Sequence, residues 1–300
     1  MRYFIMIKNN VFVHGNNILQ KLNSKVKYTD RESVLFLKEI SQRYEVWKKG
    51  NLELKGPFKN SSLDEIQEII CERVELLNNY KDFLDVQKYA EHFDSRSNLH
   101  SSVLEEFMYY LFKDIVEEIS PHALIGKSHS FKDIFFRSNS YGNMVERPYA
   151  VIEKKDHDFS IGISVNAEMN CNGSQKNEVH IWDIPAIAIE CKTYLDKTML
   201  QDVSTAAEEI KLKNPNAMYI VVAEWIKLTE NINLKKYKVD QIYVLRKQKN
   251  TDREYRFLDG YVKNPIYEDA VMHLFILVKD FLTSDWEGGV NYGLQNGYLL

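Results

Sequence analysis

The chain has 300 residues, 44% of them hydrophobic, and 39 Lys and Arg against 43 Asp and Glu give a formal net charge of −4. This composition excludes collagen-like, low-complexity and disordered chains, and three cysteines at no metal-binding spacing argue against a zinc site. No apolar run approaches the ~20 residues that cross a membrane, and the apolar N-terminus is too short for a signal sequence, so a cytoplasmic protein is expected.

Residues 1–95 are predicted to form a mainly helical N-terminal subdomain. Residues 1–15 favour a hairpin, and Asp30 caps an amphipathic helix. Ser62-Leu-Asp-Glu65 is a capping box that opens a second long helix, in which Asn78-Asn79 is a candidate interruption. This part carries no recognisable chemistry, so DNA recognition and dimerisation stay open as its role.

Residues 96–300 are predicted to form an α/β unit. An amphipathic helix comes first, then three strands that begin antiparallel, then a helix and a strand parallel to the third strand. The expected ranges are 101–116 for the first helix, 149–153, 158–165 and 184–189 for the strands, 197–213 for the second helix, and 217–223 for the last strand.

The stretch from Ile184 to Ile189 is short and almost wholly apolar, as in a strand buried on both faces. It ends in Glu190-Cys-Lys192, and alternation along a strand turns the carboxylate and the ammonium to one face. Burying these charges without partners is costly, so they require each other, a metal ion or water. A solvated pair at a strand end is the more common reason for such a pattern.

The segment that begins at Asp158 alternates as a second strand and ends in a polar loop, Met169 to Asn177. If the two strands form an antiparallel hairpin, facing residue numbers sum to about 348, which sets Asn166 near Trp182 and Asp158 beside Glu190. Two carboxylates at one point repel each other, and a divalent cation is the usual reason to place them there.

Two other acids are weighed for this cluster. Asp183 lies seven residues before Glu190, roughly 23 Å away along an extended strand, and is rejected. Asp156 shares a strand face with Asp158 and ranks second to it.

Two further segments have the composition of nucleic-acid contacts. Residues 126–148 combine basic, aromatic and amide side chains, which fit base edges and phosphates but also an ordinary long loop. Residues 227–256 hold nine Lys or Arg against four acids, a basic stretch that fits phosphate binding or a solvated surface.

The strand end and the helix after it, Ile189-Glu-Cys-Lys-Thr-Tyr-Leu-Asp-Lys-Thr-Met-Leu200, together with Asp156-His-Asp-Phe-Ser-Ile-Gly162, resemble the PD-(D/E)XK nuclease fold. Within that fold the segment is similar to restriction endonucleases of the DdeI, BbvCI and Bpu-ten-I group. The similarity covers about residues 95–250. The predicted order of helices and strands is that of the PD-(D/E)XK core.

The resemblance implies a type II restriction endonuclease that hydrolyses phosphodiester bonds in double-stranded DNA with Mg²⁺. Asp158 and Glu190, with the backbone carbonyl of Cys191, would hold the metal, and Lys192 would orient the attacking water. Glu105 fits an acid position that nucleases of this fold often carry on the first helix, where it would hold the same water or a second ion. A solvated Glu105 is the alternative, and whether Glu106 or Asp156 joins the site stays open.

The resemblance also suggests a short target of the C-T-N-A-G type, within a restriction-modification system. One active site per chain favours a homodimer on double-stranded DNA, with a heterodimer of two related subunits as the alternative. The rival functions are a repair or other nuclease on the same core, and a non-catalytic DNA-binding protein with a degenerate nuclease fold.

Overall fold

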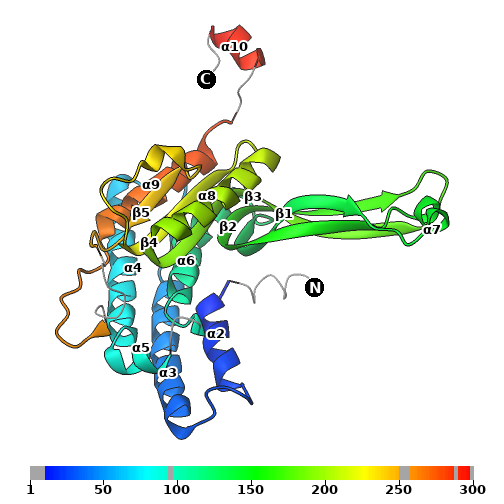
Figure 1. Cartoon of the computed structure of the whole chain (residues 1–300). Coiled ribbons are helices and arrows are strands. Elements are labelled where there is room, and N and C mark those ends of the chain that lie inside the picture. Colours follow the sequence, from blue (N-terminus) through cyan, green and yellow to red (C-terminus); the bar gives the residue numbers. More distant parts are fainter. Residues whose placement is uncertain (1–10, 94–96, 250–256, 287–289, 298–300) are drawn as a thin grey trace.

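A five-stranded sheet in the order β1-β2-β3-β4-β5 organises the chain, and helices cover both of its faces (Figure 1). The computed structural model describes residues 11–93, 97–249, 257–286 and 290–297. The strands are β1 (Leu124–Phe136), β2 (Ala150–Asn170), β3 (Asn177–Leu195), β4 (Met218–Ile226) and β5 (Gln241–Val244). The helices are α2 (Val13–Leu22), α3 (Arg31–Glu53), α4 (Leu63–Leu84), α5 (Gln87–His92), α6 (Ser102–Ile119), α7 (Tyr141–Glu146), α8 (Lys197–Lys213), η2 (Leu234–Lys236), α9 (Glu268–Thr283) and α10 (Val290–Asn296).

The predicted core order is confirmed from α6 onward. Helix α6 precedes three strands with antiparallel pairing, and α8 then crosses over to β4, which lies parallel to β3. Alternation along β3 separates two apolar cores: Ile187 and Ile189 pack on the side of α6, and Ala188 packs on the side of α8. The sheet therefore lies between two helical layers.

The first strand of this core was predicted wrongly. Four of the five residues of the range 149–153 belong to β2, which runs from Ala150 to Asn170. The true first strand is β1, most of which falls in the segment 126–148 considered as a loop or DNA contact. The buried face of β1 carries Gly126, Ser128 and Ser130 in place of aliphatic residues. The hydroxyl of Ser128 lies 2.8 Å from that of Ser160 on β2, so hydrogen bonding satisfies this polar interior.

The outer parts of β1, β2 and β3 project from the body as an arm, residues 129–156 and 163–183, with α7 at its tip (Figure 1). Beside α7 the N–H groups of Tyr149 and Ala150 donate to the Glu178 carboxylate, 2.9 Å away in each case, which ties the start of β2 to β3. At the root of the arm the β2–β3 register shifts between Ile161 and Gly162, and only glycine fits there, since a Cβ on Gly162 would lie 2.2 Å from the carbonyl oxygen of Ile184.

The front helices were predicted correctly in the main. Asp30 accepts from Ser33 N at the start of α3, and Ser62 and Glu65 form the expected capping box at α4. Helix α4 runs through Asn78-Asn79 without interruption. The hairpin over residues 1–15 is wrong where it can be checked, because Val13 begins α2; residues 1–10 lie outside the described part.

The hydrophobic core crosses the boundary predicted between residues 95 and 96. One cluster joins Leu37 of α3 and Leu77 of α4 to Phe107 of α6, Ile189 of β3 and Phe275 of α9. A recognition or dimerisation role for residues 1–95 stays a prediction. None of the helices in the described ranges is long and apolar enough to span a lipid bilayer.

Four buried charges also join the front helices to the sheet. Lys81 Nζ lies 3.1 Å from Asp85 Oδ1 at the end of α4 and 2.8 Å from Glu224 Oε1 on β4. Arg246 Nε donates to Glu224 Oε2 at 3.0 Å, and Arg246 Nη2 lies 3.6 Å from Asp85 Oδ2. The four charges alternate in sign around a closed ring, which offsets the cost of burying each one.

Breaking this ring is expected to destabilise the whole chain. Lys81→Met leaves Glu224 and Asp85 buried with one cation fewer, and should lower the free energy of unfolding by about 3–5 kcal/mol. Lys49→Met, which removes an exposed pair with Glu53, is the control and should cost less than about 0.5 kcal/mol. Urea unfolding measures both, and equal losses in the two variants would contradict the role of the ring.

Candidate active site

The β2–β3 ladder brings Asp158 and Glu190 together. Phe159 pairs with Ile189, so the next position toward the end of β3 sets Asp158 across from Glu190, as predicted. Farther out the register shifts by one residue between Ile161 and Gly162. Trp182 therefore faces Val165 and not Asn166, which corrects the predicted register for the outer half of the hairpin.

Lys192 joins the two carboxylates. Its Nζ lies 2.6 Å from Glu190 Oε1 and 3.6 Å from Asp158 Oδ2. The backbone N–H of Cys191 donates to Asp158 Oδ2 at 2.9 Å, and the Tyr219 hydroxyl donates to Glu190 Oε2 over a long 3.5 Å. These contacts fix both carboxylates from neighbouring strands while their side chains stay partly accessible to solvent.

The two acids of the site, Asp158 and Glu190, repel each other. Burial and then the negative charge of Glu190 raise the pKa of Asp158, although Lys192 opposes the rise. Burial disfavours the charge on Lys192, yet Asp158 and Glu190 outweigh burial and raise the pKa of Lys192 above its ordinary value. Lys192 is therefore a permanent cation, and the pair of carboxylates attracts further positive charge.

Glu105 and Glu106, adjacent on α6, serve different parts of the structure. Glu105 has a side chain only 10% exposed, and its Oε2 lies 4.0 Å from Lys127 Nζ. Burial and then the charge of Asp158 raise the pKa of Glu105 to about 7, which places Glu105 in the electrostatic field of the Asp158–Glu190 pair.

Glu106 is fully buried, faces α2 and α3, and has no contact with this site. Its carboxylate accepts the backbone N–H groups of His14 and Gly15 at 2.9 and 3.1 Å, and the hydroxyls of Tyr44 and Tyr110 at 2.9 and 2.6 Å. An acid at a helix N-terminus satisfies N–H groups that have no partner within the helix. Glu106 thus caps α2 and ties α3 to α6.

Asp156 and Asp183 lie apart from the cluster. The Asp156 side chain is 66% exposed, and its Oδ1 lies 2.6 Å from His129 Nδ1 on β1. Asp183 accepts the backbone N–H of His129 at 2.7 Å, at the root of the arm. Both acids serve the arm, and Asp158 remains the acid on β2 that meets Glu190.

The donor set suits a hard divalent cation. Asp158 and Glu190 supply carboxylate oxygens, and the backbone carbonyl of Cys191, the residue after Glu190, is a further candidate oxygen. Within the described residues no group of three or more His, Cys, Asp and Glu side chains is close enough to hold a metal. A metal here would therefore rely on two carboxylates, with water and substrate oxygens completing its shell.

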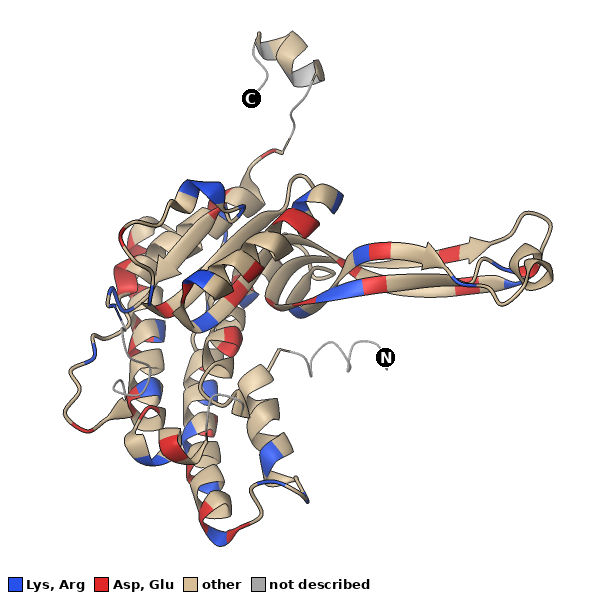
Figure 2. Ribbon diagram, viewed as in Figure 1, with Lys and Arg blue, Asp and Glu red and all other residues tan. Residues whose placement is uncertain are grey.

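Three of the seven Lys and Arg in the described part of the basic stretch, residues 227–249, are engaged within the chain, and phosphate binding by this stretch stays a prediction. Arg246 is buried in the charged ring, Lys247 pairs with Asp269, and Lys249 pairs with Glu230 2.8 Å away. Residues 250–256 lie outside the described part. Lys and Arg alternate with Asp and Glu on the arm as well, so neither region is uniformly basic (Figure 2).

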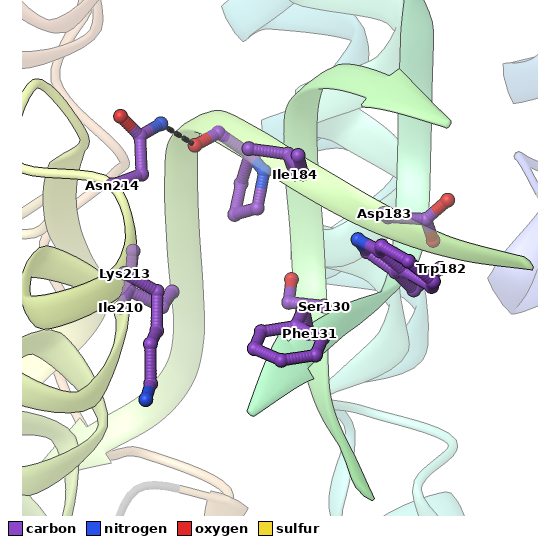
Figure 3. Close-up of a pocket in the computed structure, with 9 residues that line it drawn as sticks. Ser130, Phe131, Trp182, Asp183, Ile184, Ile210, Lys213 and Asn214 are labelled. Carbon is purple, nitrogen blue, oxygen red and sulfur yellow. Dashed lines mark hydrogen bonds between the residues drawn. The ribbon is translucent and has the colours of Figure 1, made fainter. Parts of the chain in front are cut away.

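A small apolar pocket lies at the root of the arm, away from the carboxylates. It has a volume of about 120 Å³, and Phe131, Trp182, Ile210 and Lys213 are among the residues that line it (Figure 3). The side-chain amide of Asn214 donates to the Pro185 carbonyl at its rim, 2.9 Å away. Among the residues that line this pocket, Asp183 is the acid and Lys213 the base, and neither Asp158 nor Glu190 lines it.

Sequence reasoning missed Tyr219 and the particular position of Lys127. Tyr219 lies within the predicted strand 217–223, but only the parallel register with β3 places its hydroxyl at Glu190. Lys127 belongs to a segment singled out for its composition, and only β1 brings it to Glu105.

Comparison with known proteins supports a nuclease. A search of curated proteins finds no match. A solved structure described as "native BbvCI A2B2 tetramer at low resolution" matches with a TM-score of 0.69 at 21% sequence identity, covering 92% of this chain and 98% of that one. At this identity the likeness shows a restriction-endonuclease-like fold.

The family model described as Bpu10I restriction endonuclease matches residues 96–287, which include β1 to β5 and all the acids and lysines of the site. The chain therefore belongs to the Bpu10I restriction endonuclease family.

Proposed function

We propose that this chain is a Mg²⁺-dependent endonuclease that cuts double-stranded DNA at a short specific sequence. The observation that carries the proposal is the cluster of Asp158, Glu190 and Lys192, with Lys192 Nζ 3.6 Å from Asp158 and 2.6 Å from Glu190. Membership of a restriction endonuclease family supports double-stranded DNA as the substrate.

Asp158, Glu190 and the Cys191 carbonyl would hold the metal. Mg²⁺ takes hard oxygen ligands and, when bound, polarises a phosphate and makes a neighbouring water more acidic. The N–H of Cys191 holds Asp158 Oδ2, and Tyr219 holds Glu190 Oε2, so the carboxylates keep their place before substrate arrives.

Lys192 and Glu105 would act on the water and the phosphate. The Lys192 ammonium orients the attacking water and offsets the negative charge that grows on the phosphate oxygens. Glu105, with a pKa of about 7, accepts the proton that the water loses as its oxygen bonds to phosphorus and the bond to the sugar oxygen breaks.

For assembly, we propose a homodimer that acts on a near-palindromic target of the C-T-N-A-G type. One chain supplies one Glu-x-Lys site with a suitably placed upstream acid and would therefore cut one strand, and two-fold symmetry matches a palindrome. The similar BbvCI structure is an A2B2 tetramer, which makes a second, related chain the alternative partner here.

A plasmid assay tests the function and the assembly together. The purified chain is incubated with supercoiled plasmid in Mg²⁺ or in EDTA, and the new termini are mapped. Fixed termini that need Mg²⁺ support restriction, random termini indicate repair-like cutting, and intact plasmid favours a non-catalytic binding protein. Linear product supports a homodimer, whereas nicks confined to one strand indicate a missing partner chain.

The two carboxylates are expected to be essential. Asp158→Asn and Glu190→Gln keep the side-chain shape but lose the charge, and should lower the cleavage rate by at least about 100-fold while DNA binding survives. Asp156→Asn, on the same strand, is the control and should cut normally, because Asp156 lies apart from the cluster. Near-normal cutting by Asp158→Asn would sink the assignment of the metal ligands.

Glu105 is expected to make stability depend on pH. Its pKa of about 7 in the folded chain exceeds the ordinary value of about 4.3, so the folded state binds the extra proton between these pH values and loses stability as the pH rises. In metal-free buffer the wild type should lose about 2–3 kcal/mol more than Glu105→Gln between pH 5 and 8. Glu117→Gln, an exposed change on α6, should follow the wild type, and parallel pH profiles for wild type and Glu105→Gln would refute the buried acid.

A further inference from the structure

Lys127 lies across the β1–β2 ladder from the acid of the site. Gly126 pairs with Ser160 and Ser128 pairs with His157, so the single residue Lys127 faces two residues of β2, Asp158 and Phe159. Such a bulge redirects a side chain, and bulges are common beside active sites. The irregularity therefore falls on the residue pair that presents Asp158.

The Lys127 ammonium is held more loosely than that of Lys192. Its Nζ lies 4.0 Å from Glu105 Oε2, and its side chain is 37% exposed. Lys192 is 25% exposed, and both neighbouring carboxylates hold it, the nearer at 2.6 Å. A lysine has three donors on a flexible stem, so Lys127 can keep its place near Glu105 and still reach a ligand.

The charges of the cluster favour that use. The cluster has three carboxylates, those of Glu105, Asp158 and Glu190, against the ammonium groups of Lys127 and Lys192. Lys192 contacts Asp158 and Glu190, and Lys127 contacts Glu105. Burial and the charge of Asp158 raise the pKa of Glu105. The positive charge of Lys127 opposes this rise more strongly than that of Lys192. Lys127 thus supplies positive charge on the α6 side of the site, where Lys192 contributes less.

We propose that Lys127 is a further catalytic residue, whose ammonium donates a hydrogen bond to a non-bridging oxygen of the scissile phosphate. There it offsets charge that grows on the phosphate as the attacking oxygen bonds to phosphorus. The inference rests on the proposed endonuclease function. The simpler possibility is that Lys127 only compensates the negative charge of Glu105. The two roles predict different effects of Lys127→Met on DNA binding, and different cleavage rates when Lys127→Met is combined with Glu105→Gln.

Binding of DNA gives a readout that does not require cleavage. The probe is a fluorescent duplex taken from the plasmid above, titrated in Ca²⁺ at several salt concentrations. Each phosphate contact adds about 0.9 to the slope of log affinity against log salt, so Lys127→Met should lower the slope by about that amount. Lys211→Ala, which removes a lysine of α8 whose Nζ lies 2.7 Å from Asp240 Oδ1, is the control and should leave the slope unchanged.

Cleavage kinetics separate direct contact from an effect through Glu105. Lys127→Met should lower the single-turnover rate by about 100-fold, Lys127→Arg should recover part of it, and Lys127→Met should lower the rate further when it is added to Glu105→Gln. Thermal melting of each variant confirms that it is folded.

The outcomes distinguish this inference from the function beneath it. If the wild type cuts, but Lys127→Met keeps the full salt slope and adds nothing to Glu105→Gln, the phosphate contact is overturned and the endonuclease stands. If the wild type binds duplex without cutting it, the proposed endonuclease function fails. If Lys127→Met then shows the same salt slope as the wild type, the proposed contact between Lys127 and the phosphate is overturned as well. A wild type that neither binds nor cuts duplex overturns both.

Discussion

The structure depends on the antiparallel pairing that sets Asp158 against Glu190. Two carboxylates on neighbouring strands repel each other, and Lys192, the Cys191 N–H and the Tyr219 hydroxyl compensate only in part, since the pKa of Asp158 stays raised. A cluster of this kind costs stability in the absence of a ligand. The cation and the phosphate that we propose as ligands would offset this cost, because they would complete the charge of the cluster.

Helix α6 connects this cluster to the front of the molecule. Glu105 points toward the acids of the sheet, while Glu106, one residue later, caps α2 and receives Tyr44 of α3. The same helix therefore fixes an acid of the site and anchors the front helices. The buried ring of Lys81, Asp85, Glu224 and Arg246 makes a second connection between the front helices and the sheet.

Sequence patterns sufficed where a property was local. The apolar run of β3, the alternation of β2 and the capping box at Ser62 identified their elements, and the register near Asp158 followed from the short loop. Strand β1 was not predicted, because its buried face carries serines in place of aliphatic residues, and Ser128 is hydrogen-bonded across to Ser160 on β2. Glu106 and Arg246 could not be placed, because only the tertiary fold brings His14 to Glu106 and Glu224 to Arg246.

Metal binding tests the central claim most directly, because it asks whether the Asp158–Glu190 pair is a cation site before any DNA is present. Thermal unfolding is followed while Mg²⁺ or Ca²⁺ is added to the EDTA-treated chain, alongside Asp158→Asn. The account predicts a rise in the unfolding midpoint for the wild type, since a ligand that binds only the folded state stabilises it, and a much smaller rise for the variant. No shift of the wild type at millimolar metal, or equal shifts in both proteins, would contradict it.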